Sequence, residues 1–382
     1  MTAAGADDAA AARRYAEARY RLLLLELVCS VCLLLLAQAS GISHALARWW
    51  VQRTPAESLA LLGYLAVFGL AYYAAMLPLH FHGSFVLEHR FGLSRLTLGG
   101  WLRREAKHLA VSAVLSAVLL ESLYALLRHT PRQWPLLATL GWLVFTVVLA
   151  RVFPTVLLPL FYKTVPLQDA ALADRLLALC KRAGLQALGV FRFDLGAETR
   201  KANAALAGLG RTRRVLLSDT LLAEFSPDEI EGVLAHEVGH HHYRHITKLL
   251  ALSAVGSWAA FALTDAAGRW WVHRLGLQGL WDIAGFPVLV LWLSALSFLS
   301  LPLQNGLSRH FEWQSDRFAV SMSQPAAFAG ALRRLAQLNL ADPQPPRWVV
   351  QWFYDHPPIT ERIQAAERAG NPGRPPGVLS DG

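Results

Sequence analysis

The chain has 382 residues, of which 54% are hydrophobic and only 16% are charged. Soluble globular proteins carry about 25% charged residues, so the composition excludes an ordinary soluble protein and indicates a polytopic membrane protein. The formal net charge is +9, but the sequence contains neither a basic groove nor a nucleic-acid-binding motif, so we expect no nucleic-acid partner.

Apolar runs recur along the chain with the length that a membrane crossing requires. A transmembrane helix needs about 20 apolar residues. A polar tail at 1–20 comes first, and the fourth run is interrupted by Arg151 and Pro154, so a division there would give a seventh span. We predict a mainly α, polytopic α-helical membrane protein with six to seven spans, whose runs cover residues 22–42, 59–79, 109–127, 135–161, 246–266 and 285–303.

Lysine and arginine alternate between rich and poor loops along these spans. The loop at 80–108 and the polar region at 162–245 are rich in both, whereas the loops after the first, third and fifth runs are poor. Because positively charged loops stay inside, we expect both of these segments and both termini to be cytoplasmic. The lipid bilayer is therefore an expected partner of a multi-pass integral membrane protein.

The polar region at 162–245 has the pattern of a cytoplasmic α+β domain. An amphipathic helix is predicted at 169–183, and strands are predicted at 190–194, 204–209 and 214–217. A further helix begins at Ser226, because serine as N-cap, Pro227 at the first helical position and Glu229 form a capping box. After this region, spans five and six occupy 246–305, a returning catalytic segment 306–368, and a disordered tail 369–382.

The helix that starts at Ser226 contains the pattern H-E-x-x-H at His236–His240. Residues four apart lie on one face of a helix, so His236 and His240 are expected to bind one metal ion. Glu237 lies beside them as a candidate general base, as in metalloproteases. We therefore predict a zinc-metalloprotease region with one Zn²⁺ per chain.

A catalytic zinc ion takes three protein ligands, so one ligand must come from outside this pattern. His241, His242 and His245 are close in sequence, but the helix directs most of them away from the zinc face. A better candidate follows the last span, where Glu312 and Asp316 are four apart on a predicted helix. Glu312 could bind the metal, and Asp316 could orient a ligating imidazole.

Taken together, these residues resemble the CAAX prenyl protease type 1 family, which are integral-membrane zinc metalloproteases of the gluzincin kind. The similarity extends over residues 85–362. Ala205, where the family often has an aromatic residue, and Ser315, where it often has alanine, depart from the pattern. The segments that carry the resemblance are 85–93, 159–163, 166–167, 203–222, the zinc motif with His245, 305–316, and His356-Pro357-Pro358 with Glu361-Arg362.

The resemblance implies further site residues. It assigns support of the ligands to Asp316, Arg309 and His245, stabilisation of the oxyanion to His356 or Arg362, and substrate binding to Asn203 and Ala204. By this resemblance we expect an endopeptidase for peptide or protein substrates, with Glu237 transferring a proton from water to the leaving amine.

The expected substrates are prenylated CAAX proteins. If the chain is a bacterial member, where prenylated substrates can be absent, membrane-protein quality control is expected beside this function or in its place. One alternative is a quality-control protease of the HtpX type, against which the four spans before the zinc helix argue. Another is a non-enzymatic, metal-regulated membrane transporter. A transporter often contains related halves, and no internal repeat is apparent here.

Overall fold

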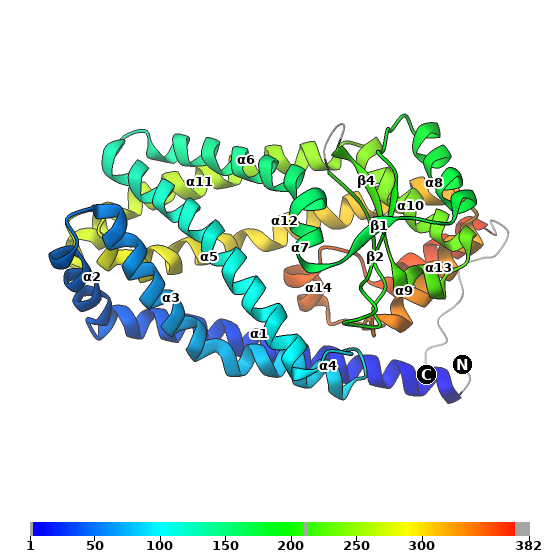
Figure 1. Cartoon of the computed structure of the whole chain (residues 1–382), viewed down its shortest axis with the longest axis horizontal. Coiled ribbons are helices and arrows are strands. Elements are labelled where there is room, and N and C mark those ends of the chain that lie inside the picture. Colours follow the sequence, from blue (N-terminus) through cyan, green and yellow to red (C-terminus); the bar gives the residue numbers. More distant parts are fainter. Residues whose placement is uncertain (1–2, 209–211, 371–382) are drawn as a thin grey trace.

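The computed structural model describes residues 3–208 and 212–370. Long helices form one end of the molecule, and a small sheet among shorter helices forms the other (Figure 1). Within the described residues, six helical segments have the length and hydropathy to cross a membrane. This confirms the multi-pass, mainly α architecture, with spans built on α1 (Ala3–Ala39), α3 (Glu57–Phe81), α5 (Leu98–His129), α6 (Trp134–Val152), α11 (His245–Arg274) and α12 (Phe286–Met322).

Large apolar side chains lie exposed in the middle of these helices. Leu70, Val144 and Val255 have exposed fractions of 61%, 64% and 66%. Leaving such groups in water costs roughly 25 cal/mol per Å² of apolar surface, a penalty that hydrocarbon does not impose. The outer faces of the long helices are therefore surfaces suited to lipid.

The fourth span continues past its proline without dividing. Pro154 lies in η2 (Phe153–Leu157), a π-helical turn between α6 and α7 (Leu158–Phe161). Proline has no N–H to donate, and a wider turn lets the chain stay helical around it. The structure therefore has one long helix here, and the described residues provide no seventh span.

Helical structure also extends into segments that were predicted as a tail and a loop. α1 begins at Ala3, so residues 3–20 of the predicted tail and the first span form one helix. α3 continues through η1 (His82–Val86) into α4 (Leu87–Arg90), which occupies part of the predicted loop at 80–108. Between the first two spans lies α2 (Ile42–Arg53). Apart from its first two residues, the predicted disordered tail at 369–382 lies outside the described residues.

The region at 162–245 contains a four-stranded sheet with the order β1-β2-β4-β3. β2 and β4 are parallel, and each outer strand is antiparallel to its neighbour. Sequence patterns did not predict β1, because its three residues follow a span directly and end in a proline. The strands are β1 (Thr164–Pro166), β2 (Val190–Phe193), β3 (Ala204–Ala207) and β4 (Arg214–Ser218).

One hydrophobic core joins the sheet to the helix that carries the zinc motif. Leu176 of α8, Leu217 of β4 and Leu234 of α10 are buried in it together. The predicted capping box is present at the start of α10, where Ser226 and Glu229 each bind the other's backbone N–H. The helices of this region are α8 (Ala170–Arg182), α9 (Asp219–Glu224), α10 (Pro227–His242), α13 (Pro325–Leu338), α14 (Arg347–Phe353) and α15 (Ile359–Gly370).

α12 connects the two ends of the molecule (Figure 1). It has 37 residues, which corresponds to about 55 Å at 1.5 Å per residue. Its last turns pack closely against α10 at Gly239, where an added Cβ would lie 3.0 Å from Ser315 Cα and 3.3 Å from Phe318 Cβ. The absence of a side chain at Gly239 therefore permits the close approach that brings Glu312 beside the histidines of α10.

Candidate active site

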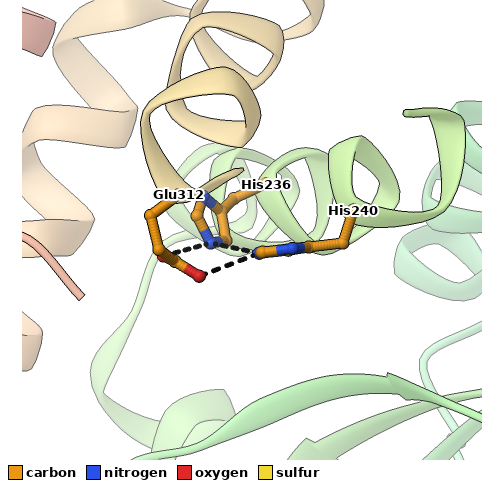
Figure 2. Close-up of side chains that lie close together, drawn as sticks. All are labelled: His236, His240 and Glu312. Carbon is orange, nitrogen blue, oxygen red and sulfur yellow. Dashed lines mark hydrogen bonds and ion pairs between the residues drawn. The ribbon is translucent and has the colours of Figure 1, made fainter. Parts of the chain in front are cut away.

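Three side chains from α10 and α12 meet where these helices cross (Figure 2). His236 Nε2 and His240 Nε2 lie 3.2 Å apart. Glu312 approaches both, with Oε2 3.2 Å from His236 Nε2 and Oε1 3.1 Å from His240 Nε2. The ligand atoms of the three residues all lie within 4.8 Å of one another.

This arrangement fits a divalent cation. Glu312 is only 3% exposed, and its Oε2 atom accepts no hydrogen bond from the described residues although His236 Nε2 is near. A buried carboxylate oxygen that accepts no hydrogen bond destabilises the folded protein. Burial of the carboxylate's charge without a nearby positive charge destabilises it further. A cation shared with the two imidazoles would satisfy all three groups.

A buried carboxylate holds His236 from the opposite side of its ring. Asp316 Oδ1 lies 2.8 Å from His236 Nδ1. Arg362 Nε and Nη2 donate to Asp316 Oδ2 and Oδ1 at 2.8 and 2.6 Å. Burial lowers the pKa of His236, but the carboxylates of Asp316 and Glu312 outweigh it and raise this pKa to about 9. The predicted contact between Asp316 and an imidazole is thus present, and its arginine partner is Arg362, not Arg309 or Arg317.

A chain of polar side chains supports His240 through Nδ1, the ring nitrogen that does not face Glu312. His245 Nδ1 lies 3.1 Å from His240 Nδ1, and His245 Nε2 lies 2.9 Å from Gln314 Oε1. The His245 ring stacks on Phe311, with 4.3 Å between ring centroids. His245 therefore contacts His240 from behind and does not join the group of three.

A cavity of about 410 Å³ lies beside the three residues, and five further predicted site residues line it. Glu237 lines it and forms no hydrogen bond or ion pair with any described residue. His356 has half of its side chain exposed, with Nε2 3.4 Å from Glu312 Oε1 and Nδ1 2.8 Å from Asp355 Oδ1. The hydrogen bond with His356 lowers the pKa of Asp355, so a carboxylate faces this imidazole. Also among the lining residues are Asn203, Ala204, Arg362, Phe328, Leu332, Leu335, Tyr354 and Ile359.

Arg309 lies away from the ligands and binds the backbone that leads to His356. Its Nη1 atom donates to the carbonyl oxygens of Val350 and Tyr354 at 2.8 and 2.6 Å. The Arg309 guanidinium is thus bound by backbone carbonyl groups of the protein. Through this contact α12 fixes the position of the segment that carries His356.

His241 contacts the edge strand of the sheet and does not join the three candidate metal ligands. Its Nε2 atom lies 3.1 Å from the carbonyl oxygen of Leu206 in β3. Burial lowers the pKa of His241 and so favours the neutral imidazole. The Leu206 carbonyl of β3, which follows Asn203 and Ala204 along the strand, therefore already has a partner within the protein.

Sequence reasoning missed several residues that contact the site. Gln314 binds His245, Asp355 binds His356, and Phe328 of α13 stacks on His236 with 6.2 Å between ring centroids. Asp355 had a local signal, because it directly precedes His356. Gln314 and Phe328 had none, since their contacts depend on how α12 and α13 pack against α10.

Comparison with known proteins agrees with this geometry. The family model for peptidase family M48 matches residues 166–369, and the model described as "CAAX prenyl protease N-terminal, five membrane helices" matches residues 4–163. The first match covers more than half of the chain. The chain belongs to peptidase family M48. It is therefore a membrane metalloprotease, a hydrolase whose family implies a metal cofactor.

Relatives of this M48 peptidase span most of its length. The uncharacterized metalloprotease YhfN of Bacillus subtilis is 27% identical over 370 residues, covering 96% of this chain and 87% of that protein. CAAX prenyl protease 1 of Saccharomyces cerevisiae is 26% identical over 338 residues, covering 84% and 74%. The crystal structure of S. mikatae Ste24p has the same fold, with a TM-score of 0.85 at 23% identity over 94% of this chain and 89% of that chain.

Proposed function

We propose that this M48 peptidase is a zinc endopeptidase in which His236, His240 and Glu312 bind one zinc ion. The observation that carries the proposal is the convergence of these side chains beside a cavity that Glu237 lines. Two imidazoles and one carboxylate are a ligand set of catalytic zinc, which keeps a further position open. When bound, zinc polarises the scissile carbonyl and activates the attacking water.

Glu237 is the proposed general base. It follows His236 directly in α10, lines the cavity, and forms no hydrogen bond or ion pair in the described part of the chain. A carboxylate in this position takes a proton from the attacking water and passes it to the leaving amine. Asp316 and Arg362 hold the His236 ring, and His245 holds the His240 ring, so that both imidazoles keep their orientation.

For the oxyanion, we propose His356 as the donor in preference to Arg362. The Nε2 atom of His356 lies close to Glu312 in the cavity, and Asp355 fixes its Nδ1 atom. Arg362 is only 8% exposed, and it uses Nε and Nη2 to bind Asp316. An oxyanion needs a donor that can point at the reacting carbonyl, and the half-exposed His356 meets this requirement better. Arg362 acts on catalysis through Asp316.

An extended peptide is proposed to pair with the start of β3 at Asn203 and Ala204. β3 is an edge strand, and such an edge can accept a substrate strand by backbone hydrogen bonds. His241 occupies the Leu206 carbonyl, which limits pairing to the residues before it. Beyond this strand, Leu332 and Leu335 of α13 provide an apolar wall for a substrate side chain.

The proposed substrates are membrane-associated proteins that are prenylated near the C-terminus, because several relatives are named CAAX prenyl protease 1. The cytoplasmic side is proposed for the site and both termini. In support, α1 starts and α15 lies at the same end of the molecule as the sheet (Figure 1), and the basic segments at 80–108 and 162–245 belong to the side that retains positive charge.

The test compares cleavage of a farnesylated CAAX peptide with cleavage of its unprenylated form. Wild type is expected to cleave the farnesylated peptide faster. Glu237→Gln is expected to retain one zinc ion by elemental analysis and to lose cleavage by about 10²–10⁴-fold, the usual contribution of acid–base catalysis. Glu224→Gln is the matched control, because Glu224 is exposed at the end of α9 and lies outside the cavity.

The outcomes separate the parts of the proposal. Wild-type cleavage by Glu237→Gln would contradict the assignment of the base. Equal rates on both peptides would remove prenyl recognition and favour general membrane-protein quality control. A purified chain that binds metal but cleaves neither peptide would contradict the proposed substrate class.

A further inference from the structure

A second cavity, of about 580 Å³, lies apart from the metal-binding residues, against the first helix. Its wall combines α1 with the end of α4, the segment before β3 and the segment after α13. Four arginines and one carboxylate, Glu17, line the cavity, so its lining has three more positive than negative side chains. The positive residues are Arg14, Arg21, Arg90 and Arg200.

These arginines are poorly neutralised by the protein. Arg21 lies 3.8 Å from Glu17, and both side chains are largely exposed. Arg14, Arg90 and Arg200 form no side-chain hydrogen bond or ion pair in the described part of the chain. The Nε atom of Arg200 is shielded from solvent and lacks a partner. An arginine guanidinium that lacks an acceptor in the protein favours the binding of an anion whose oxygen atoms accept its hydrogen bonds.

Nearby carboxylate groups are committed elsewhere. Glu88, on α4 two residues before Arg90, accepts a hydrogen bond from Tyr15 and lies 2.8 Å from Lys201 Nζ. Arg19 also approaches Glu88, at 3.8 Å. Glu88 therefore ties α1 and α4 together and is not available to neutralise the arginines of the cavity.

The floor of the cavity is packed and holds the arginines in place. Tyr15, Leu87 and Leu93 form a small hydrophobic cluster, against which Phe91 and Leu340 pack. The Tyr15 and Phe91 ring centroids are 5.2 Å apart, and the ring planes are inclined at 62° in an edge contact. The cavity therefore lies on a packed junction of α1, α4 and the peptidase region.

The cavity lies beside the part of α1 that we expect at the edge of the bilayer. Arg21 directly precedes Leu22, where the apolar run of α1 begins. The helix rises 1.5 Å per residue, so Arg14 lies about 10 Å farther from the apolar run than Arg21. Headgroup layers are roughly 5–8 Å thick on each side of the hydrocarbon core. Arg21 therefore lies beside the headgroups, and Arg14 reaches just past them.

We propose that this arginine-lined cavity binds a phosphate group, supplied by the headgroup of an anionic phospholipid. Arginine matches phosphate oxygens with paired N–H donors, and the apolar floor at Phe91 and Leu340 can contact the glycerol of a lipid. Such a lipid joins α1 to the peptidase region. The same chemistry would accept free phosphate, and the experiment distinguishes the two sources.

The experiment uses the full-length protein purified in a mild detergent. Retention of phosphatidylglycerol and of phosphatidylcholine is measured by native mass spectrometry, and the thermal midpoint is measured with each lipid and with inorganic phosphate. Wild type is expected to retain phosphatidylglycerol selectively and to be stabilised by it. The R14Q/R90Q/R200Q variant is expected to bind it at least tenfold more weakly.

The matched control, R103Q/R347Q/R368Q, removes three exposed arginines that have no ion pair in the described chain and do not line the cavity. It should bind phosphatidylglycerol like wild type. Equal weakening in both variants would show general attraction to charge and overturn the proposal, as would no weakening in either. Stabilisation by inorganic phosphate alone, lost only in R14Q/R90Q/R200Q, would support the phosphate site and assign it to a soluble ligand.

R14K/R90K/R200K keeps the charge and loses the paired donors, so it tests the geometry of the site. Its affinity for phosphatidylglycerol is expected to lie between the affinities of wild type and R14Q/R90Q/R200Q. An affinity equal to that of wild type would contradict the role of paired donors. If R14Q/R90Q/R200Q fails to fold, the single variants R14Q and R90Q provide the same comparison. Cleavage activity is not the readout, so failure here leaves the peptidase proposal unaffected.

Discussion

Replacing Asp316 with asparagine tests how the second carboxylate of α12 serves the site. Asp316 is 5% exposed, accepts two hydrogen bonds from Arg362 and lies 2.8 Å from His236 Nδ1. Asparagine keeps the size of the side chain and removes its charge, so no cavity forms. The substitution leaves the Arg362 guanidinium buried, with Glu312 at 3.6 Å as its remaining ion-pair partner among the described residues.

Two effects of different origin are expected from Asp316→Asn. Breaking a buried ion pair by removing one partner costs about 3–5 kcal/mol, so the metal-free protein should lose that much free energy of unfolding. Losing the partner that orients a ligating imidazole usually weakens metal binding about 10–100-fold. The zinc affinity of folded protein should therefore fall by this factor.

The first effect is measured by unfolding of the metal-free protein in detergent, and the second by competition for zinc with a chromogenic chelator. Glu367→Gln is the control, because Glu367 and Arg333 form an exposed pair, and such pairs contribute at most about 1 kcal/mol. Wild-type zinc affinity in Asp316→Asn would refute the orienting role of Asp316. If the metal-free variant had the same free energy of unfolding as wild type, the stabilising role of the buried ion pair would be refuted.

Two further substitutions test the contact between α10 and α12. Gly239→Ala introduces a Cβ 3.0 Å from Ser315 Cα, which should move α12 away from α10 and draw Glu312 from the histidines. Zinc affinity should fall at least tenfold, and wild-type affinity by chelator competition would show that the contact is not needed for the site. Ser315→Ala removes a buried hydroxyl that has no partner among the described residues. An unsatisfied buried group costs about 1–3 kcal/mol, so this variant should resist thermal unfolding better at unchanged zinc affinity, and a lower midpoint would indicate a hidden partner for Ser315.

Features that depend on local spacing could be read from the sequence. His236 and His240 share a helix face because they are four residues apart, and Ser226 with Glu229 fixes the start of that helix. The six spans follow from hydropathy because a bilayer requires a long apolar helix wherever the chain crosses it. Glu312 could be selected as a candidate partner because Asp316 lies one turn beyond it.

Contacts between distant parts of the chain required the tertiary structure. Asp316 pairs with Arg362, 46 residues away, and not with Arg309 or Arg317 beside it on α12. Arg309 instead fixes the segment before His356, and this contact leaves His356 in the cavity while Arg362 is held by Asp316. No local pattern encodes these choices, because they depend on how α12, α14 and α15 pack together. The H-E-x-x-H motif determined the type of chemistry, and the packing of these helices decided which residues surround it.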